Sequence, residues 1–283
     1  MKYYYLDMFS GIGGFALGAY WAGLKFHAHY FSEVDNYAIQ VYQKRFPEAE
    51  LLGDIRNVDY KKLPAGKYLA AGGFPCQPHS VAGQKKGGKD ERDLWPECAR
   101  MLRELRPAIA LYENVPGLFV SNGGEFFNRV LSDICESGYA AEWQIISAVD
   151  AGAPHLRKRV WIVAYPDDGW IHERRRFGNA GEIVRGLSGI HCNGQSRNQG
   201  QKGKILADTT KQGLQNRADK EAAAEEHAKE FKRHGWWEIE PDVGRVAHGI
   251  PFRVDRLKCL GNAVVPQIPR LIWEKIKELF YDE

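Results

Sequence analysis

A single cysteine, Cys76, lies in a loop bounded by glycine and proline (residues 73–78, Gly-Phe-Pro-Cys-Gln-Pro). The loop follows the small apolar run 68–71, which predicts a buried strand. A cysteine at the carboxyl end of a strand can reach a substrate, and its thiolate is a strong nucleophile. Because prolines stand on both sides, we interpret Cys76 as a nucleophile rather than as a small buried hydrophobic residue.

A carboxylate follows the next apolar run of this kind, since Glu113 comes directly after residues 108–112. Residues that follow two neighbouring parallel strands meet at one edge of the sheet, so we expect Cys76 and Glu113 side by side. A glutamic acid in a desolvated pocket can give a proton or a hydrogen bond to a substrate. The alternative is a solvated carboxylate at the end of a strand.

A glycine-rich turn occupies residues 9–14 (Phe-Ser-Gly-Ile-Gly-Gly). Glycines let the backbone turn tightly into a helix and approach a ligand closely. Glu33 follows the second expected strand, 22 residues after Gly11, where an acid can bond ribose hydroxyls. The turn also satisfies the relaxed dinucleotide fingerprint, so by itself it fits NAD as well as S-adenosylmethionine.

A basic segment, residues 157–159 (Arg-Lys-Arg), precedes the apolar stretch 160–164. A guanidinium at this place can bond a base carbonyl or a phosphate through its planar fork. The start of a basic strand that faces water is the alternative on these residues alone.

Alternating strands and helices are expected to position these groups. Apolar runs predict strands at 3–9, 27–32, 51–52, 67–71, 108–112, 142–148 and 159–164. Longer periodic stretches predict helices at 13–23, 36–46, 94–105, 124–137 and 266–280. This alternation is typical of an α/β fold with a doubly wound, mostly parallel, Rossmann-like sheet.

The composition changes after Tyr165 and Pro166 and regains a core character at Val254. We therefore expect one domain from residues 1–165 plus 253–283, with a small domain, 166–252, inserted in it. Within the insert, residues 170–217 carry nine Lys or Arg and three Asp or Glu, a local charge of +6 on a chain of net charge +3. Such a basic island suits phosphate neutralisation, although a solvated surface insert would look the same.

The overall composition, 44% hydrophobic and 27% charged, is that of an ordinary soluble protein. No apolar run approaches the roughly 20 residues of a membrane helix, and the N-terminus has no signal-peptide organisation. The five cysteines are scattered and never form a CxxC pair. This spacing argues against a disulfide framework or a metal site and favours a reducing cytosol.

Five segments, in this order, resemble the DNA cytosine-carbon-5 methyltransferase family: 7–14, 73–77, 113–115, 157–159 and 261–266. The resemblance implies a methyltransferase domain that binds S-adenosylmethionine, and a target-recognition domain at 166–252. The implied cofactor-binding residues are Phe9, Gly11, Gly13, Gly14, Glu33, Asp54, Ile55, Pro75, Leu94, Asn262 and Val264.

The resemblance also implies a covalent mechanism on a cytosine flipped out of the duplex. Cys76 would attack carbon 6 so that carbon 5 can take a methyl group, and Glu113 would assist at ring nitrogen 3. Arg159 would contact the target base, and Arg157 would anchor the active-site loop. The expected substrate-binding residues are Gln77, Ser80, Arg92 and Asn114, and we expect the loop 80–93 to close over DNA.

Two positions depart from the family pattern, because many members carry glutamine at 155 and phenylalanine at 79, where this chain has His155 and His79. Neither position is the nucleophile, the acid or the final arginine. With histidine at these two positions, the family pattern does not determine the hydrogen bonds around the catalytic loop. A Cys–His protease dyad of Cys76 and His79 lacks an identifiable orienting residue.

The expected partner is double-stranded DNA, with a cognate restriction endonuclease in the same system as a further candidate. We expect a monomer in the bacterial cytosol or nucleoid, with no membrane contact. Three other interpretations stay open. They are a tRNA cytosine-5 methyltransferase of the same family, a dinucleotide-dependent oxidoreductase and a non-catalytic DNA-binding relative.

Overall fold

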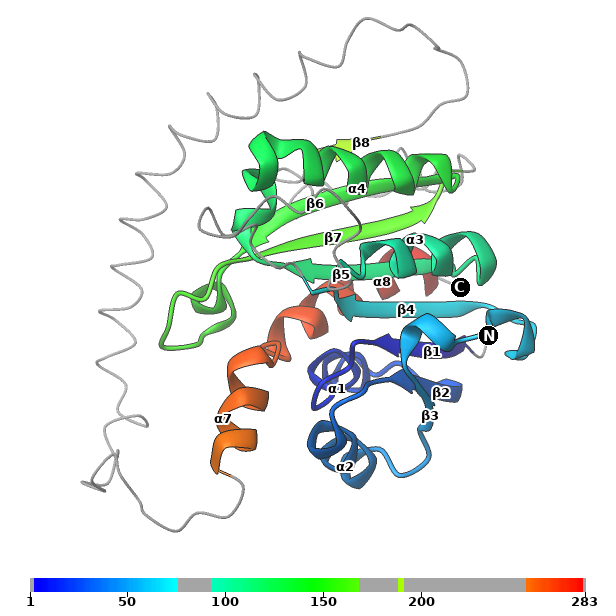
Figure 1. The fold of residues 1–283 in the computed structure, drawn as a ribbon, viewed down its shortest axis with the longest axis vertical. Coiled ribbons are helices and arrows are strands. Elements are labelled where there is room, and N and C mark those ends of the chain that lie inside the picture. The colour runs from blue at the N-terminus through cyan, green and yellow to red at the C-terminus, as the bar shows by residue number, and fades with distance from the viewer. Residues whose placement is uncertain (1–2, 76–92, 168–187, 191–252, 282–283) are drawn as a thin grey trace, which may run out of the picture. The chain divides into compact units, whose positions relative to one another are not determined.

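The computed structural model describes residues 3–75, 93–167, 188–190 and 253–281 (Figure 1). Five of the residues singled out above lie outside this part of the chain, as does nearly all of the expected insert. These five residues are Cys76, Gln77, His79, Ser80 and Arg92.

Eight strands of the described residues form one sheet in the order β3-β2-β1-β4-β5-β7-β6-β8. Their bounds are β1 (Tyr3–Met8), β2 (Phe26–Ser32), β3 (Glu50–Gly53), β4 (Tyr68–Gly73), β5 (Ile109–Asn114), β6 (Tyr139–Ile146), β7 (Arg159–Pro166) and β8 (Ser188–Ile190). The first five strands are parallel, whereas β7 pairs antiparallel with β5 and β6, and β8 pairs antiparallel with β6. The expected α/β fold with a doubly wound, mostly parallel sheet is confirmed.

The strand order reverses between β1 and β4, because the chain runs outward from β1 through β2 to β3 and then returns to the other side of β1. A reversal of this kind opens a crevice at the carboxyl ends of the strands, where ligands of such folds bind. The turn 9–14 follows β1, and the loop that contains Cys76 follows β4. The two sequence motifs therefore leave the sheet on either side of its switch point.

Helices cover both faces of the sheet. The helices are α1 (Gly14–Trp21), α2 (Asn36–Arg45), α3 (Trp95–Glu104), α4 (Glu125–Glu136), α7 (Arg253–Asn262) and α8 (Gln267–Tyr281). Figure 1 shows α3 and α4 in front of the sheet and α8 behind it. Leu6 and Met8 of β1 belong to the core that includes residues of α3 and α4, while Tyr5, on the opposite face, contacts Trp273 of α8. This alternation along β1 is expected of a strand buried on both sides.

Local sequence explains the helix ends near the switch point. The Asp35 carboxylate accepts hydrogen bonds from the backbone N–H groups of Tyr37 and Ala38, and two basic residues occupy the last turn of α2. Both features stabilise a helix through its unpaired end groups and its dipole. Gly13 precedes α1 with φ of 87°, and a Cβ there would lie 2.7 Å from the Phe46 ring. Only glycine fits that position without strain.

Three elements differ from the expected ones, and one of them is β8, a strand of the sheet in the segment that was expected to form the insert. The strand expected at 142–148 begins earlier, at Tyr139, because residues 139–141 are fully buried and continue the ladder with β7. The sequence predicted only that a core character returns at Val254. The structure places a helix there, α7, and its Lys258 pairs with Asp35 at 2.6 Å.

Residues 147–157 belong to a separate compact unit from the sheet. Within it, Ser147 caps the short helix η5 (Ala148–Ala151), and its backbone N–H donates to Asp150 at 2.8 Å. The Ser147 hydroxyl and the Ala148 N–H both bond the Leu156 carbonyl. These hydrogen bonds join the start of the segment, at residues 147 and 148, to its end, at residue 156. The sequence-based division at residues 165 and 253 stays a prediction.

Cysteines in the described part of the chain differ in their state. Cys98 is buried and free, and Cys259 is free, whereas Cys135 takes part in a disulfide that the scattered spacing did not predict. Among the same described residues, no group of His, Cys, Asp and Glu could hold a metal ion. No helix in this part of the structure is both long and apolar enough to cross a membrane.

Candidate active site

The glycine turn after β1 is tied to the end of β2 by backbone hydrogen bonds. The N–H of Ser10 donates to the Ser32 carbonyl at 3.0 Å, and the N–H of Gly11 donates to the Glu33 carboxylate at 2.8 Å. The other oxygen of Glu33 accepts from the N–H groups of Val34 and Asp35 at 2.8 and 2.9 Å. Three backbone donors therefore fix this half-buried carboxylate at the switch point.

The C-terminal motif packs against this turn. A Cβ on Gly14 would lie 2.9 Å from the Val264 carbonyl oxygen, so the two backbones touch where a side chain would separate them. About 250 residues of chain separate Gly14 from Val264. Two of the cofactor-binding residues expected from sequence thus meet in space.

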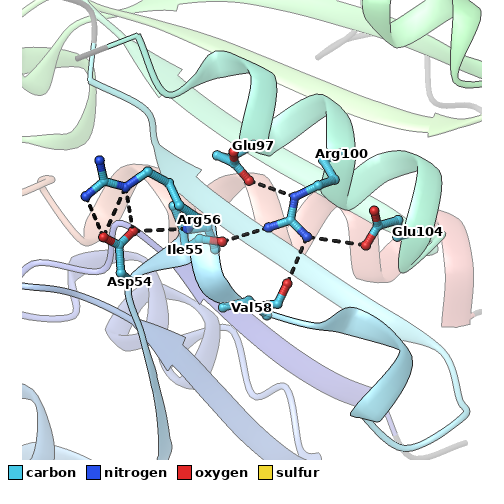
Figure 2. A network of polar contacts seen from close by, with 7 residues as sticks. All are labelled: Asp54, Ile55, Arg56, Val58, Glu97, Arg100 and Glu104. Atoms are coloured by element: carbon cyan, nitrogen blue, oxygen red, sulfur yellow. Dashed lines mark hydrogen bonds and ion pairs between the residues drawn. The ribbon is translucent and has the colours of Figure 1, made fainter. Parts of the chain in front are cut away.

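A second acidic position lies beyond β3. Asp54 caps the short helix η1 (Ile55–Asn57) by accepting the Arg56 N–H at 3.0 Å, and the Arg56 guanidinium bonds both carboxylate oxygens (Figure 2). These hydrogen bonds hold the pKa of Asp54 below its usual range. The carboxylate is therefore charged at neutral pH and already paired. Ile55 is buried.

Two buried oxygens at the turn have no hydrogen-bond partner among the described residues: the Ser10 hydroxyl and Oδ1 of Asp7. Unpaired buried polar atoms are rare and call for a ligand or an ordered water. Together with the Glu33 carboxylate and the close backbone of the turn, they fit a ligand that joins a nucleoside to a polar, charged group. S-adenosylmethionine has this composition.

A carboxylate and a guanidinium lie together on the other side of the switch point. Gly73 of β4 stands opposite Glu113 of β5, and a Cβ on Gly73 would lie 3.0 Å from the Glu113 carboxylate. Arg159, at the start of β7, donates from Nε to Glu113 at 2.7 Å. Both side chains are mostly buried, with 22% and 13% of their surface exposed. The acid is thus fixed beside the strand that leads to Cys76.

A protein-family model matches most of the chain. The model of C-5 cytosine-specific DNA methylases matches residues 3–240. The chain belongs to this family. S-adenosylmethionine is the cofactor of the family.

Curated members of the methylase family resemble the chain over part of their length. Type II methyltransferase M1.ScrFI of Lactococcus lactis subsp. cremoris is 39% identical over 58% of this chain and 42% of its own. Type II methyltransferase M.NgoBI of Neisseria gonorrhoeae is 38% identical over 58% of this chain and 50% of its own. The chain spans about half the length of the curated relatives it matches.

Among solved structures, the Dnmt2 methyltransferase of S. pombe aligns with 23% identity and a TM-score of 0.48. The alignment covers 58% of this chain and 51% of that one.

Most of the site residues predicted from sequence fall in the sheet unit, in segments next to its strands and helices. Phe9, with φ of 50°, and the three glycines lie in the turn after β1, and Pro75 lies just after β4. Leu94 precedes α3, and Asn262 ends α7. Arg157 lies in the separate unit of residues 147–157, so the structure does not place it beside the others.

The side-chain amide of Asn114 is hydrogen-bonded to the protein backbone in this structure. Its amide donates to the Phe74 carbonyl at 3.1 Å and accepts the Val115 N–H at 2.8 Å, and only 3% of the residue is exposed. These bonds hold the backbone just after β4, two residues before Cys76. A contact with substrate, which the sequence predicted, stays a prediction.

A buried polar chain below the glycine turn was missed by the sequence reasoning. The Tyr42 hydroxyl donates to Oδ2 of Asp7 at 2.9 Å, and His29 Nε2 lies 2.7 Å from the same hydroxyl. Because the single proton of Tyr42 goes to Asp7, His29 must donate from Nε2 and accept from Tyr20 at Nδ1, 3.3 Å away. The only signal in the sequence is that two histidines, His27 and His29, lie in a strand that is otherwise mostly apolar.

Burial shifts the pKa values of two groups in this series of hydrogen-bonded side chains. It lowers the pKa of His29 to about 4 and raises the pKa of Asp7 well above its usual range, although the hydrogen bond from Tyr42 opposes the second shift. His29 is therefore neutral at neutral pH. The chain links the end of β1, just before the cofactor turn, to Tyr20, which is exposed at the surface.

Proposed function

We propose that this protein transfers a methyl group from S-adenosylmethionine to carbon 5 of cytosine in a specific sequence of double-stranded DNA. The observation that carries the proposal is the Glu113–Arg159 pair, which lies beside Gly73 on the strand that leads to Cys76. The setting proposed is a bacterial restriction-modification system, because the curated relatives are named type II methyltransferases. A cognate endonuclease and a monomeric state belong to the same proposal.

The cofactor would be held by the turn 9–14, by Glu33 through a ribose hydroxyl and by Asp54 and Ile55 at the adenine. Leu94, Asn262 and Val264 complete this set. When bound, S-adenosylmethionine supplies an electrophilic methyl group on a sulfonium. The fixed Glu33 carboxylate and the close approach of Gly14 to Val264 mean that the site needs little rearrangement to bind.

Cys76 would supply the nucleophile. Its thiolate adds to carbon 6 of the cytosine, which forms a carbon–sulfur bond and places an electron pair on carbon 5. Carbon 5 can then accept a methyl group, after which its proton leaves to a base and the cysteine is eliminated. Cytosine must leave the stack for this attack, because carbon 6 is approached from the face of the ring.

Glu113 would hold a proton at ring nitrogen 3, where negative charge develops as sulfur adds to carbon 6. Arg159 keeps the Glu113 carboxyl in one orientation by its bond from Nε, and its Nη1 donates to the Lys158 carbonyl at 2.9 Å. Nη2 would donate to the base carbonyl. The Asn114 amide fixes the Phe74 carbonyl and thereby the start of the Cys76 loop. The site thus has a separate group for attack, for protonation and for orientation.

The test is incubation with radiolabelled S-adenosylmethionine and, in parallel, unmethylated genomic DNA and bulk tRNA. Label recovered as 5-methylcytosine in DNA is the expected result, and bisulfite sequencing then gives the recognition sequence. Label in tRNA alone would replace this proposal by the RNA-methylating alternative. No label in either, from a protein that binds the cofactor, would favour a non-catalytic DNA-binding protein.

A further inference from the structure

Arg100 lies in a network of polar contacts with the segment that follows β3 (Figure 2). Its guanidinium donates from Nη2 to the Ile55 carbonyl and from Nη1 to the Val58 carbonyl, each at 2.8 Å. Arg100 belongs to α3, about 45 residues further along the chain. It therefore joins two segments that are distant in sequence.

The guanidinium is itself held in one orientation. Glu97, one turn earlier on α3, accepts from Nε at 2.7 Å, and Glu104, one turn later, lies 3.3 Å from Nη1. The Tyr60 ring lies under the guanidinium carbon, 4.8 Å from the ring centroid. Hydrogen bonds in the plane of the group and an aromatic ring beneath it leave little rotational freedom.

Helix α3 is fixed in turn against α4. The Trp95 side chain is fully buried, and its Nε1 donates to Asp133 at 2.7 Å. Asp93 pairs with Arg129 of α4 just before the helix begins. Leu94, one of the residues expected to line the cofactor, lies between these two anchors. The position of α3 is therefore defined where the chain enters it.

The segment that Arg100 grips has little support from its own backbone. Helix η1 is three residues long, and its backbone bonds run from Asn57 N–H to the Asp54 carbonyl at 2.9 Å and from Val58 N–H to the Ile55 carbonyl at 3.3 Å. Such short 3₁₀ turns are marginal without side-chain support. The two charge-assisted bonds from Arg100 supply that support from outside.

We propose that Arg100 is a positioning residue for the cofactor, which holds residues 54–58 against α3 so that the adenine-binding backbone is formed before binding. This inference rests on the proposed function, because it takes residues 54 and 55 as the adenine site. Arg100 also makes Leu94 and Asp54 parts of one rigid frame. The adenine site and the helix that follows the catalytic loop would then hold a constant geometry.

The experiment compares Arg100→Met and Arg100→Lys with Arg103→Met, which removes an exposed charge from the same helix. Isothermal titration calorimetry would measure the dissociation constants of S-adenosylmethionine, S-adenosylhomocysteine and 5′-methylthioadenosine. All three carry adenine, and the last lacks the amino-acid group. We expect Arg100→Met to raise all three constants by the same factor, about tenfold, with Arg103→Met unchanged.

Arg100→Lys should fall between the wild type and Arg100→Met, because one ammonium group cannot reach two carbonyls and two carboxylates together. In steady-state methylation, KM for S-adenosylmethionine should rise while kcat at saturating cofactor stays within about twofold. A general loss of structure would instead lower kcat as well. If Arg100→Met does not fold, the Lys variant gives the same comparison.

Wild-type protein that binds the three ligands, with both Arg100 variants binding them equally tightly, would overturn this inference and leave the proposed function standing. A wild type that binds none of the three would overturn the proposed function and the inference with it. Weakened binding of S-adenosylmethionine without weakened binding of 5′-methylthioadenosine would also contradict a role at the adenine.

Discussion

The two sides of the switch point hold their carboxylates in different ways. On the side of β1 and β2, Glu33 is bonded by three backbone N–H groups, and Asp7 is fully buried under the turn. On the side of β4 and β5, Glu113 is bonded by a side chain, Arg159. Backbone donors cannot rotate away, whereas a side-chain partner can exchange between the acid and a substrate. This difference agrees with the proposed roles, which are cofactor binding on the first side and reaction on the second.

The largest effect is expected when the reacting groups alone are removed, since this tests whether they act in the reaction and not in cofactor binding. Cys76→Ser and Glu113→Gln should each reduce methylation by about 10²-fold or more, because each removes a group that acts in the bond-making steps. The dissociation constant of S-adenosylmethionine, measured by calorimetry, should not change. Cys259→Ser is the matched control and should keep full activity. Normal turnover by Cys76→Ser would sink the covalent mechanism.

The opposite result is expected on the binding side. Gly14→Ala places a methyl group 2.9 Å from the Val264 carbonyl oxygen, so the turn or the C-terminal motif must shift. We expect the free energy of unfolding to fall by about 1–3 kcal/mol and the cofactor affinity to fall with it. Denaturant melts and calorimetry measure both quantities. Gly11→Ala adds a methyl group where no atom lies within 4 Å, at a residue with φ of 52°. This variant therefore measures backbone strain alone, whereas Gly14→Ala measures crowding.

The buried chain under the turn gives a pH dependence. The pKa of His29 is lowered from 6.5 to about 4 in the folded protein, so between these values the unfolded chain binds a proton that the folded chain does not. The contribution of His29 is complete above pH 6.5 and is lost as the pH falls toward 4, by about 3 kcal/mol in total. Urea melts across this range measure it.

Two variants separate the contribution of His29 from the contributions of the other groups that titrate in this pH range. His29→Gln should flatten the dependence between pH 6.5 and 4, whereas His27→Gln, at an exposed position of the same strand, should leave it unchanged. Equal slopes for the wild type and His29→Gln would show that the histidine does not stay neutral in the fold.

The smallest effect is expected at the surface, where Asp35 caps α2 and pairs with Lys258 of α7. Asp35→Ala should cost about 1 kcal/mol, since it removes the cap, while Lys258→Met should cost less than Asp35→Ala because the pair is exposed. Thermal melts of the two variants compare these values. A larger loss from Lys258→Met would mean that the contact between α7 and the start of α2 matters more than the cap.

Local patterns were enough to place the reacting and binding residues on the chain. Glycines and strand-end acids are set by the backbone conformation of a few adjacent residues, so the turn, Glu33 and Glu113 could be found from sequence. The juxtaposition of Glu113 with the strand before Cys76 was expected, and the pairing of Gly73 with Glu113 agrees with it. Arg100 and His29 gave no such signal, because their partners lie on other elements.

The sequence by itself determined most of the elements, the turn that approaches the cofactor and the residue types that can attack and protonate a base. Only the tertiary structure decided that β1 lies between β2 and β4, and that β7 runs antiparallel so that Arg159 reaches Glu113. It also decided that Val264 touches Gly14 and that Arg100 grips residues 55 and 58. Local propensity acts over a few neighbouring residues, whereas these contacts depend on strand order and helix packing across the whole sheet.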